Sequence, residues 1–207
     1  MIKIDFKKEL KHLYNPPARE PVIVDMPSMN YLMVDGAGDP NTAQEAGDAI
    51  EALYPVAYAL KFLVKKEKAT DYGVMPLEGL WWADDMAQFT PHNKDIWKWT
   101  YMIMQPEHIS GDMVDKVLEQ VQKKKNLTAL HKVRFESLAE GLSAQIMHIG
   151  PFSAEGPTIE RLHRFIKENG YSFDGLVQKH HEIYLSDIRK VAPEKMKTIL
   201  RQPILKG

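Results

Sequence analysis

The chain contains two stretches with the same order of predicted elements, and this internal duplication limits its fold more than any other feature. Each stretch begins with a strand, a turn and a second strand, and continues with an amphipathic helix and further strands. The first strand pair is PVIVDMPSMNYLMVDGAG, ending near Gly36, and the second is KVRFESLAEGLSAQIMHIGPFS, ending near Gly150. The repeat predicts two strand-and-helix halves related by a pseudo-twofold axis.

The first half contains the longest predicted helix, which covers NTAQEAGDAIEALYPVAYALKFLVKK. One apolar stripe recurs at spacings of three and four along it, at Ile50, Leu53, Ala57, Leu60 and Val64. Asn41 and Gln44 have the spacing of a capping box, so we expect the helix to begin there. Pro55 lies in its middle and is expected to kink it.

The remaining elements follow from shorter patterns. Residues 74–83 and 96–104 are predicted strands, and residues 112–125 form a predicted helix. In the second half, a helix after Gly150 ends at Gly170, and its apolar residues are Ile159, Leu162, Phe165 and Ile166. The strand KHHEIYLSD follows, and a short helix opened by Pro193 is expected to end the chain.

These elements predict an α+β fold of two strand-helix-strand-strand modules. We expect antiparallel sheets with helices on one face and a central ligand cleft on the other. Residues 1–20 are expected to be a polar, extended lead-in, and residues 21–207 a single domain. Its two halves would cover about residues 21–110 and about residues 111–207.

Composition excludes several classes of function. The formal net charge of −1 produces no general attraction for nucleic acid or for anionic lipid. The basic run Lys123–Lys125 is explained by the end of a predicted helix, where positive charge is favourable. There is no cysteine, so disulfides, thiolate metal sites and a cysteine nucleophile are excluded. We find no signal peptide and no run long enough to span a bilayer, and therefore expect a cytoplasmic protein.

Two glutamates are candidates for chemistry. Aligning PLEGLWW with HHEIYLS places Glu78 opposite Glu182, an offset of 104 residues. Because side chains alternate along a strand, Glu182 shares a face with Tyr184, and Glu78 shares one with Trp82. A carboxylate among aromatic rings in a cleft is partly desolvated, which raises its pKa and makes it a better base. The alternative is that both glutamates are ordinary solvent-facing strand residues.

Aromatic residues cluster in the first half, where all four Trp lie within residues 81–99. Such rings can cover a flat ligand, although for any single Trp core packing is the simpler explanation. The residues predicted to bind the ligand are Trp82, Trp97, Tyr101 and Phe152.

A metal site is not expected. His180 and Glu182 share a strand face, but no third ligand stands at a recognisable spacing. There is also no nucleophile-elbow pattern around the serines and no glycine-rich phosphate loop. We therefore expect neither a metal nor an organic cofactor.

Several segments resemble the GyrI-like small-molecule-binding family, whose fold is also the effector-binding domain of BmrR-type and some AraC-type regulators. They are PLEGLWW, WKWTYMIMQPEHI, HIGPFSAEGPTIERLHRFI and HEIYLSD, and the resemblance extends from about Pro21 to Ile204. Together with SDIRKVAPEKMKTILRQP, they are most similar to a stand-alone branch associated with hydrolysis of cyclopropanoid DNA-alkylating natural products. The resemblance implies a central ligand cleft whose acidic residue is Glu182.

The regulators carry a helix-turn-helix domain, for which we expect no room in this chain. The leading hypothesis is therefore a cofactor-independent hydrolase that opens a cyclopropane ring. Glu182, assisted by Glu78, would take a proton from water, and Tyr184 or Tyr101 would donate a hydrogen bond to the oxygen that gains negative charge.

Two other functions stay open. The first is non-catalytic sequestration of a flat aromatic or cationic small molecule by charge pairing and cation–π contact. The second is a protein-interaction role like that of the gyrase inhibitor. Neither nucleic acid nor a membrane is an expected partner, and the sequence does not determine the oligomeric state.

Overall fold

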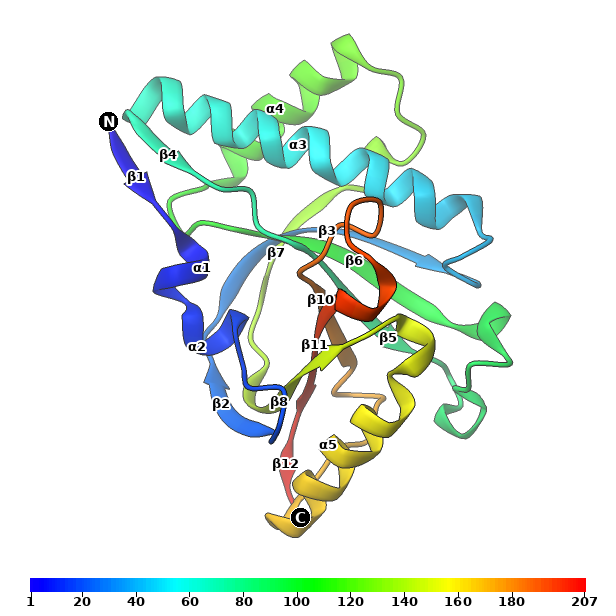
Figure 1. Ribbon diagram of the computed structural model, residues 1–207. Coiled ribbons are helices and arrows are strands. Elements are labelled where there is room, and N and C mark those ends of the chain that lie inside the picture. Colours follow the sequence, from blue (N-terminus) through cyan, green and yellow to red (C-terminus); the bar gives the residue numbers. More distant parts are fainter.

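The computed structural model describes all residues 1–207, and its centre is one eight-stranded antiparallel sheet (Figure 1). Its strand order is β2-β8-β11-β10-β5-β6-β3-β7. The bounds are β2 Val22–Met26, β3 Met29–Ala37, β5 Leu77–Trp82, β6 Lys98–Gln105, β7 Arg134–Leu138, β8 Gly141–Ile149, β10 His180–Tyr184 and β11 Lys197–Pro203. Two small sheets pair β1 (Ile2–Ile4) with β4 (Thr70–Tyr72) and β9 (Tyr171–Ser172) with β12 (Leu205–Lys206).

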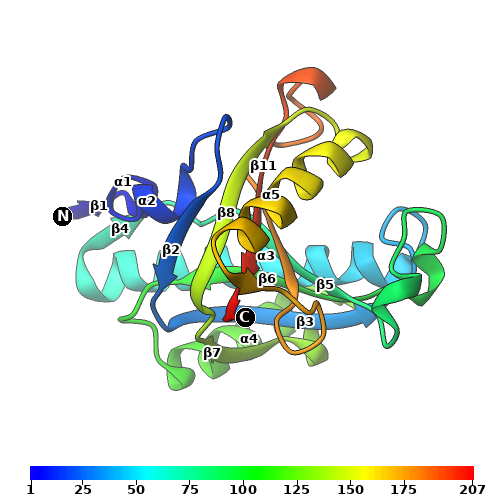
Figure 2. The ribbon, with the colours of Figure 1, turned by 90° about the horizontal axis from the view of Figure 1, so that it is seen from below.

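The strand order confirms the α+β fold and the duplicated pattern. Reading outward from the boundary between β10 and β5, each strand has a counterpart in the other half: β10 and β5, β11 and β6, β8 and β3, and β2 and β7. The outermost strands are exchanged, because β2 pairs with β8 and β7 pairs with β3. The predicted strand–turn–strand units are therefore not hairpins. Figure 2 shows β2 lying beside β8 while β3 runs across the other half.

The long helix is α3 (Gln44–Lys68), and its predicted apolar stripe is buried except for Ile50, which is half-buried. Pro55 lies inside the helix. The predicted capping box is wrong: the N-cap is Ala43, which makes no side-chain cap hydrogen bond. Asn41 instead donates from its backbone and its side chain to Asp39, at 3.0 and 2.7 Å.

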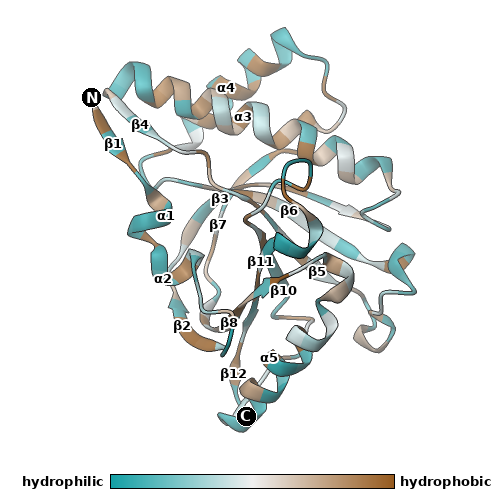
Figure 3. Ribbon diagram, viewed as in Figure 1, coloured by the Kyte–Doolittle hydropathy of each residue, from teal (hydrophilic) through white to brown (hydrophobic).

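The other two long helices are α4 (Gly111–Lys124) and α5 (Gly156–Glu168). Both are amphipathic, and Figure 3 shows hydrophilic and hydrophobic residues alternating along them. On β8 and β11, Ile146 and Leu200 pack with Leu162 and Ile166 of α5. Figure 1 shows α3 and α5 on the same side of the sheet, in front of it.

The predicted terminal helix is mostly wrong. Only Pro193–Lys195 forms a single 3-10 turn, and the following residues form β11. All residues of β11 except Lys197 are buried, and β11 pairs with β8 on one side and with β10 on the other. A strand buried on both faces shows no polar–apolar alternation, so its period could not identify it.

The first twenty residues are more than an extended lead-in. They form β1 and the two short helices α1 (Phe6–Glu9) and α2 (Lys11–Tyr14). Leu13 and Tyr14 are buried and belong to the main hydrophobic core. None of the helices combines the length and the apolar character needed to cross a lipid bilayer.

Candidate functional site

The register of the two central strands decides which carboxylates can meet. Glu78 lies opposite Ile183, and Glu182 lies opposite Gly79. Directly opposed residues of an antiparallel pair project to the same side, so Glu78 and Glu182 project from opposite faces of the sheet. The prediction that both line one pocket is wrong. The alignment that paired Glu78 with Glu182 was shifted by one residue. Because side chains alternate along a strand, a shift of one residue moves a side chain to the other face of the sheet.

Glu182 lies within a group of side chains that we call the Glu182 cluster, namely Glu182, Tyr184, Trp81, Tyr101, Glu155 and Phe152. The cluster lies on the helix-bearing face, because Glu182 is opposite Leu200, which packs against α5. A cleft on the helix-free face was expected. The side chain of Glu182 is 16% exposed, so solvent reaches this largely buried carboxylate.

Tyr184 holds the Glu182 carboxylate in place. Its hydroxyl donates to Oε2 of Glu182 at 2.7 Å and accepts from the indole Nε1 of Trp81 at 3.0 Å. Burial, and then the charge of Glu182, raise the pKa of Tyr184, so the phenol keeps its proton. The single hydroxyl proton of Tyr184 is used in the hydrogen bond to Glu182. Tyr184 therefore orients the carboxylate and cannot at the same time donate to a ligand oxygen.

His180 makes a second contact with the carboxylate. Its Nε2 lies 3.3 Å from Oε1 of Glu182, and its Nδ1 lies 3.1 Å from the side-chain nitrogen of Gln202. An amide nitrogen only donates, so Nδ1 accepts and the ring proton is on Nε2, pointing at Glu182. The structure groups no three His, Asp or Glu side chains that could hold a metal ion.

Aromatic rings pack on Trp81 and Tyr184, the two side chains that are hydrogen-bonded in series to this carboxylate. Trp81 meets Tyr101 and Trp97 edge to face, at centroid distances of 5.7 and 5.8 Å. Phe152 meets Tyr184 at 5.6 Å. Burial, and then the charge of Glu182, raise the pKa of Tyr101, whose hydroxyl makes no hydrogen bond within the protein. Tyr101 thus lies near Glu182 with its hydroxyl free to donate, Phe152 contacts the Tyr184 that binds Glu182, and Trp97 joins the group through Trp81.

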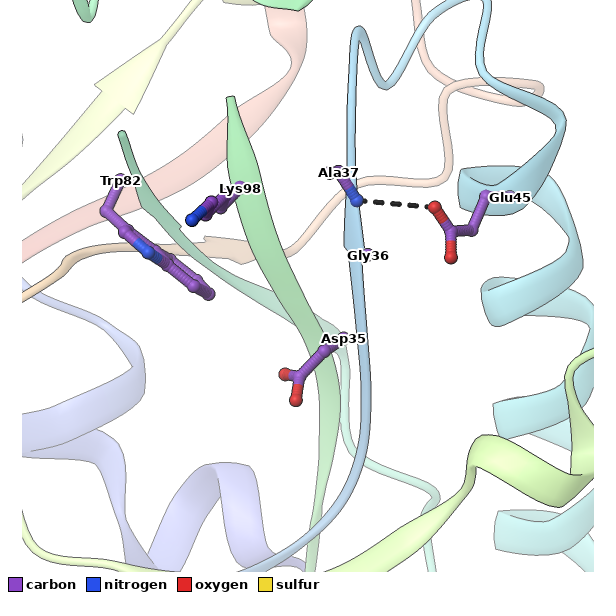
Figure 4. Close-up of a pocket in the computed structure, with 6 residues that line it drawn as sticks. All are labelled: Asp35, Gly36, Ala37, Glu45, Trp82 and Lys98. Atoms are coloured by element: carbon purple, nitrogen blue, oxygen red, sulfur yellow. Dashed lines mark hydrogen bonds between the residues drawn. The ribbon is translucent and has the colours of Figure 1, made fainter. Parts of the chain in front are cut away.

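Trp82, the other predicted ligand-binding residue, is not part of this group. It lies opposite Lys98 and projects to the other face, where the ammonium of Lys179 sits 3.6 Å from its ring centroid. Figure 4 shows the shallow pocket of about 360 Å³ that it lines there. The other lining residues are Asp35, Gly36, Ala37, Glu45 and Lys98.

Glu155 belongs to the Glu182 cluster and was not predicted from the sequence. It immediately precedes α5, is 6% exposed, and its Oε1 has no hydrogen-bond partner. Burial, and then the charge of Glu182, raise its pKa to about 9, although a hydrogen bond with Thr198 and the charge of Lys94 oppose the shift. The only sequence signal was its place in HIGPFSAEGPT, where an acidic residue at a helix start normally has a capping or dipole role.

Glu78 belongs to a separate network of hydrogen-bonded side chains on the opposite face of the sheet. We call it the Glu78 network, and its members are Tyr14, Glu78, His181, Glu140 and Arg201. Glu78 is fully buried; it accepts from the Tyr14 hydroxyl at 2.7 Å and lies 2.9 Å from Nε2 of His181. Nδ1 of His181 lies 2.9 Å from Glu140, which also accepts from Arg201 at 3.4 Å.

His181 carries a positive charge in this network. Burial alone would lower its pKa, but Glu140 and Glu78 outweigh burial and raise it. Both ring nitrogens then donate, one to each carboxylate. Two carboxylates thus balance one imidazolium and one guanidinium, and every charge has a partner. The arrangement is structural: it anchors α2 and the loop between β7 and β8 to the central strands.

The chain belongs to the GyrI-like family, because the profile of the GyrI-like small molecule binding domain matches residues 19–204. It is therefore a protein with a small-molecule-binding domain. No protein with a curated description matches the chain.

Solved structures agree with this assignment. A conserved protein from Listeria innocua is 42% identical, with a TM-score of 0.91, over 98% of this chain and 100% of that one. A hydrolase encoded by lin2189 from Listeria innocua is 41% identical, with a TM-score of 0.87, over the same shares. The EcmrR C-terminal domain, 12% identical, covers 91% of this chain and 98% of its own, with a TM-score of 0.55, and shares the fold alone.

Proposed function

We propose that this protein is a cofactor-independent hydrolase that opens the strained ring of cyclopropanoid, DNA-alkylating aromatic compounds. The observation that carries the proposal is the Glu182 carboxylate, which is partly exposed to solvent and held by Tyr184 and His180, with aromatic rings packed on Tyr184 and on its partner Trp81. The similarity to the hydrolase from Listeria innocua, at 41% identity over nearly the whole chain, supports the reaction class. The substrate class follows from the family resemblance.

In the proposed reaction, Glu182 takes a proton from the attacking water. The bonds from Tyr184 and His180 fix the direction of its lone pairs, so that little motion is needed to meet the water. Tyr101 has a free hydroxyl beside this carboxylate and donates a hydrogen bond to the oxygen that gains negative charge. Trp97 and Phe152 hold the flat ligand by ring contact.

The test is incubation of the pure protein with a cyclopropanoid alkylator while ring-opened product is followed by mass spectrometry. Glu182→Gln should lower turnover by about 100-fold or more, because the amide cannot accept the proton. Glu168→Gln, which neutralises an exposed glutamate at the end of α5, is the matched control and should retain turnover. Unchanged turnover in Glu182→Gln would remove the proposed base.

A second function has a specific observation in its favour. One carboxylate among several ring faces is also the arrangement that binds an amphipathic organic cation, through charge pairing and cation–π contact. In that case the protein sequesters its ligand, and the same incubation gives stoichiometric binding without product. Quenching of tryptophan fluorescence by a flat cationic dye would then saturate at one dye per chain and weaken in Glu182→Gln.

A further inference from the structure

The Glu182 cluster contains a second carboxyl group that the reaction above does not use. Glu155 is 6% exposed, and its Oε1 is buried without a hydrogen-bond partner. A buried oxygen without a partner is costly and rare in folded proteins. Its neighbour Phe152 packs against Tyr184, which places the start of α5 over the cluster.

The two carboxyl groups flank Tyr184. Glu182 accepts the Tyr184 hydrogen bond, and its charge raises the pKa of the Tyr184 hydroxyl, as does the charge of Glu155 once Glu155 is ionised. Thr198 lies opposite Tyr184 on β11, and its side chain lowers the pKa of Glu155. The groups that act on the pKa of Glu155 are Glu182 on β10, Thr198 on β11, and Lys94 in the 3-10 turn Lys94–Ile96, while Glu155 in turn acts on the pKa of Tyr184 on β10.

This arrangement sets the protonation of the pair. Burial, and then the charge of Glu182, raise the pKa of Glu155 to about 9, so Glu155 is a neutral carboxylic acid at pH 7. Two carboxyl groups in one desolvated site share protons unequally, which is how one carboxyl acts as an acid while its neighbour acts as a base.

We propose that Glu155 is a second catalytic residue, which donates its proton to the substrate while Glu182 accepts a proton from water. The inference rests on the proposed function, and the substrate class is an aromatic compound whose cyclopropane is conjugated to a carbonyl group. Water forms a C–O bond to a ring carbon, and the C–C bond of the cyclopropane breaks. The electron pair of that bond passes through the conjugated system to the carbonyl oxygen, which takes the proton of Glu155.

The step adds one water molecule in total. The product is an alcohol and a phenol, Glu182 is left protonated, and Glu155 is left as a carboxylate. Transfer of one proton from Glu182 to Glu155, directly or through solvent, restores both groups. Tyr101 then stabilises the developing oxyanion, and Glu155 neutralises it.

The experiment compares wild type with Glu155→Gln, a neutral side chain of the same size that has no acidic proton. We expect kcat to fall by about 100-fold or more, as for loss of a general acid, while ligand affinity from tryptophan fluorescence changes by less than about threefold. The wild-type rate should fall as pH rises through about 9, and this fall should be absent from the residual rate of Glu155→Gln.

Two further variants complete the test. Glu168→Gln on the same helix is the matched control and should keep both the wild-type rate and its pH profile. Glu155→Asp retains an acid that is one methylene shorter, so it should recover part of the rate together with the fall at high pH. Circular dichroism checks that each variant is folded.

The outcomes separate the two proposals. If wild type turns over and Glu155→Gln matches it, or if the variant is slow but keeps the fall above pH 9, Glu155 is not the acid and the hydrolase proposal stands. If wild type binds the alkylator and forms no product, the hydrolase proposal fails and the acid role fails with it.

Discussion

Glu78 and Glu182 stand on adjacent strands near the centre of one sheet, yet their carboxylates have opposite surroundings. Glu78 is fully buried, and its partners Tyr14 and His181 belong to a network in which positive and negative charges balance. Glu182 is partly exposed, receives bonds from neutral side chains only, and has a second carboxyl group, Glu155, as its neighbour.

The difference separates a structural carboxylate from a reactive one. In the Glu78 network every charge is matched, so adding or removing a proton is costly and nothing remains to bind a ligand. In the Glu182 cluster no lysine or arginine forms an ion pair with the Glu182 carboxylate, and Glu155 has an oxygen without a partner. Unsatisfied groups cost stability but are the ones available for chemistry. Five predictions test this division: the first two form a matched pair led by the largest expected effect, and the others follow from the larger effect to the smaller.

Glu78→Gln should lower the free energy of unfolding by about 3–5 kcal/mol, because removing one member of a buried ion pair leaves its partner charge uncompensated. The amide nitrogen would also face the protonated Nε2 of His181, so that two donors meet. Urea unfolding followed by circular dichroism measures the loss. Turnover per folded molecule should stay within about fivefold of wild type.

The reciprocal variant, Glu182→Gln, should change the unfolding free energy by less than about 1 kcal/mol, the typical scale for a neutral substitution of a partly exposed group. If Glu182→Gln proves as destabilising as Glu78→Gln, the division between the two carboxylates is incorrect.

Glu155→Gln should stabilise the protein at neutral pH. The folded state keeps Glu155 protonated up to about pH 9, whereas in the unfolded chain the carboxyl loses this proton above its ordinary pKa of 4.5. The unfolding free energy of wild type should therefore fall as pH rises between these values, and Gln removes that contribution. We expect a gain on the order of 1–3 kcal/mol at pH 7. A stability curve with the same pH slope in both proteins would contradict the raised pKa of Glu155.

Gly79→Ala should disturb the Glu182 cluster without unfolding the sheet. A Cβ at this position would lie 2.9 Å from the indole nitrogen of Trp81 and 3.1 Å from the Tyr184 hydroxyl, which are bonded to each other. Their displacement should loosen the bond that orients Glu182 and lower kcat by about tenfold, or about 1.4 kcal/mol. Gly73→Ala, where an added Cβ meets nothing within 4 Å, is the control for the mutation type.

Trp82→Ala should have the smallest effect on function. Its ring projects to the face opposite Glu182 and stacks with Lys179. We expect ligand affinity and kcat to change by less than about twofold, while Trp97→Ala should weaken ligand binding by about 1 kcal/mol through loss of a ring contact. Equal losses in both variants would mean that the ligand reaches both faces.

Local patterns were sufficient for much of the fold. The spacing of Leu53, Leu60 and Val64 predicted a long helix, and its burial in the structure agrees with the pattern. The repeated element order predicted two related halves. Patterns failed at β11, which has no alternation because distant segments bury both its faces, and at Asn41, which bonds to the nearby Asp39 instead of capping α3.

The candidate site likewise contains some features that local patterns predict and others that they do not. Tyr184 was placed beside Glu182 correctly, because residues two apart on a strand share a face whatever surrounds them. The same rule could not relate Glu78 to Glu182, since the relative face of two strands depends on their register to the single residue. Glu155 was missed because nothing in its local pattern distinguishes a helix-start carboxyl from one that folding brings beside another carboxylate.

The sequence by itself thus determined most of the elements, their duplication, the family and the Glu182–Tyr184 pair, all of which depend on neighbours along the chain. Only the tertiary structure decided that β2 pairs with β8, that Glu78 is neutralised by His181, and that Glu155 joins Glu182. The physical reason is that periodicity sets the direction of a side chain relative to its own element. Burial, charge pairing and protonation depend on which other element packs against it.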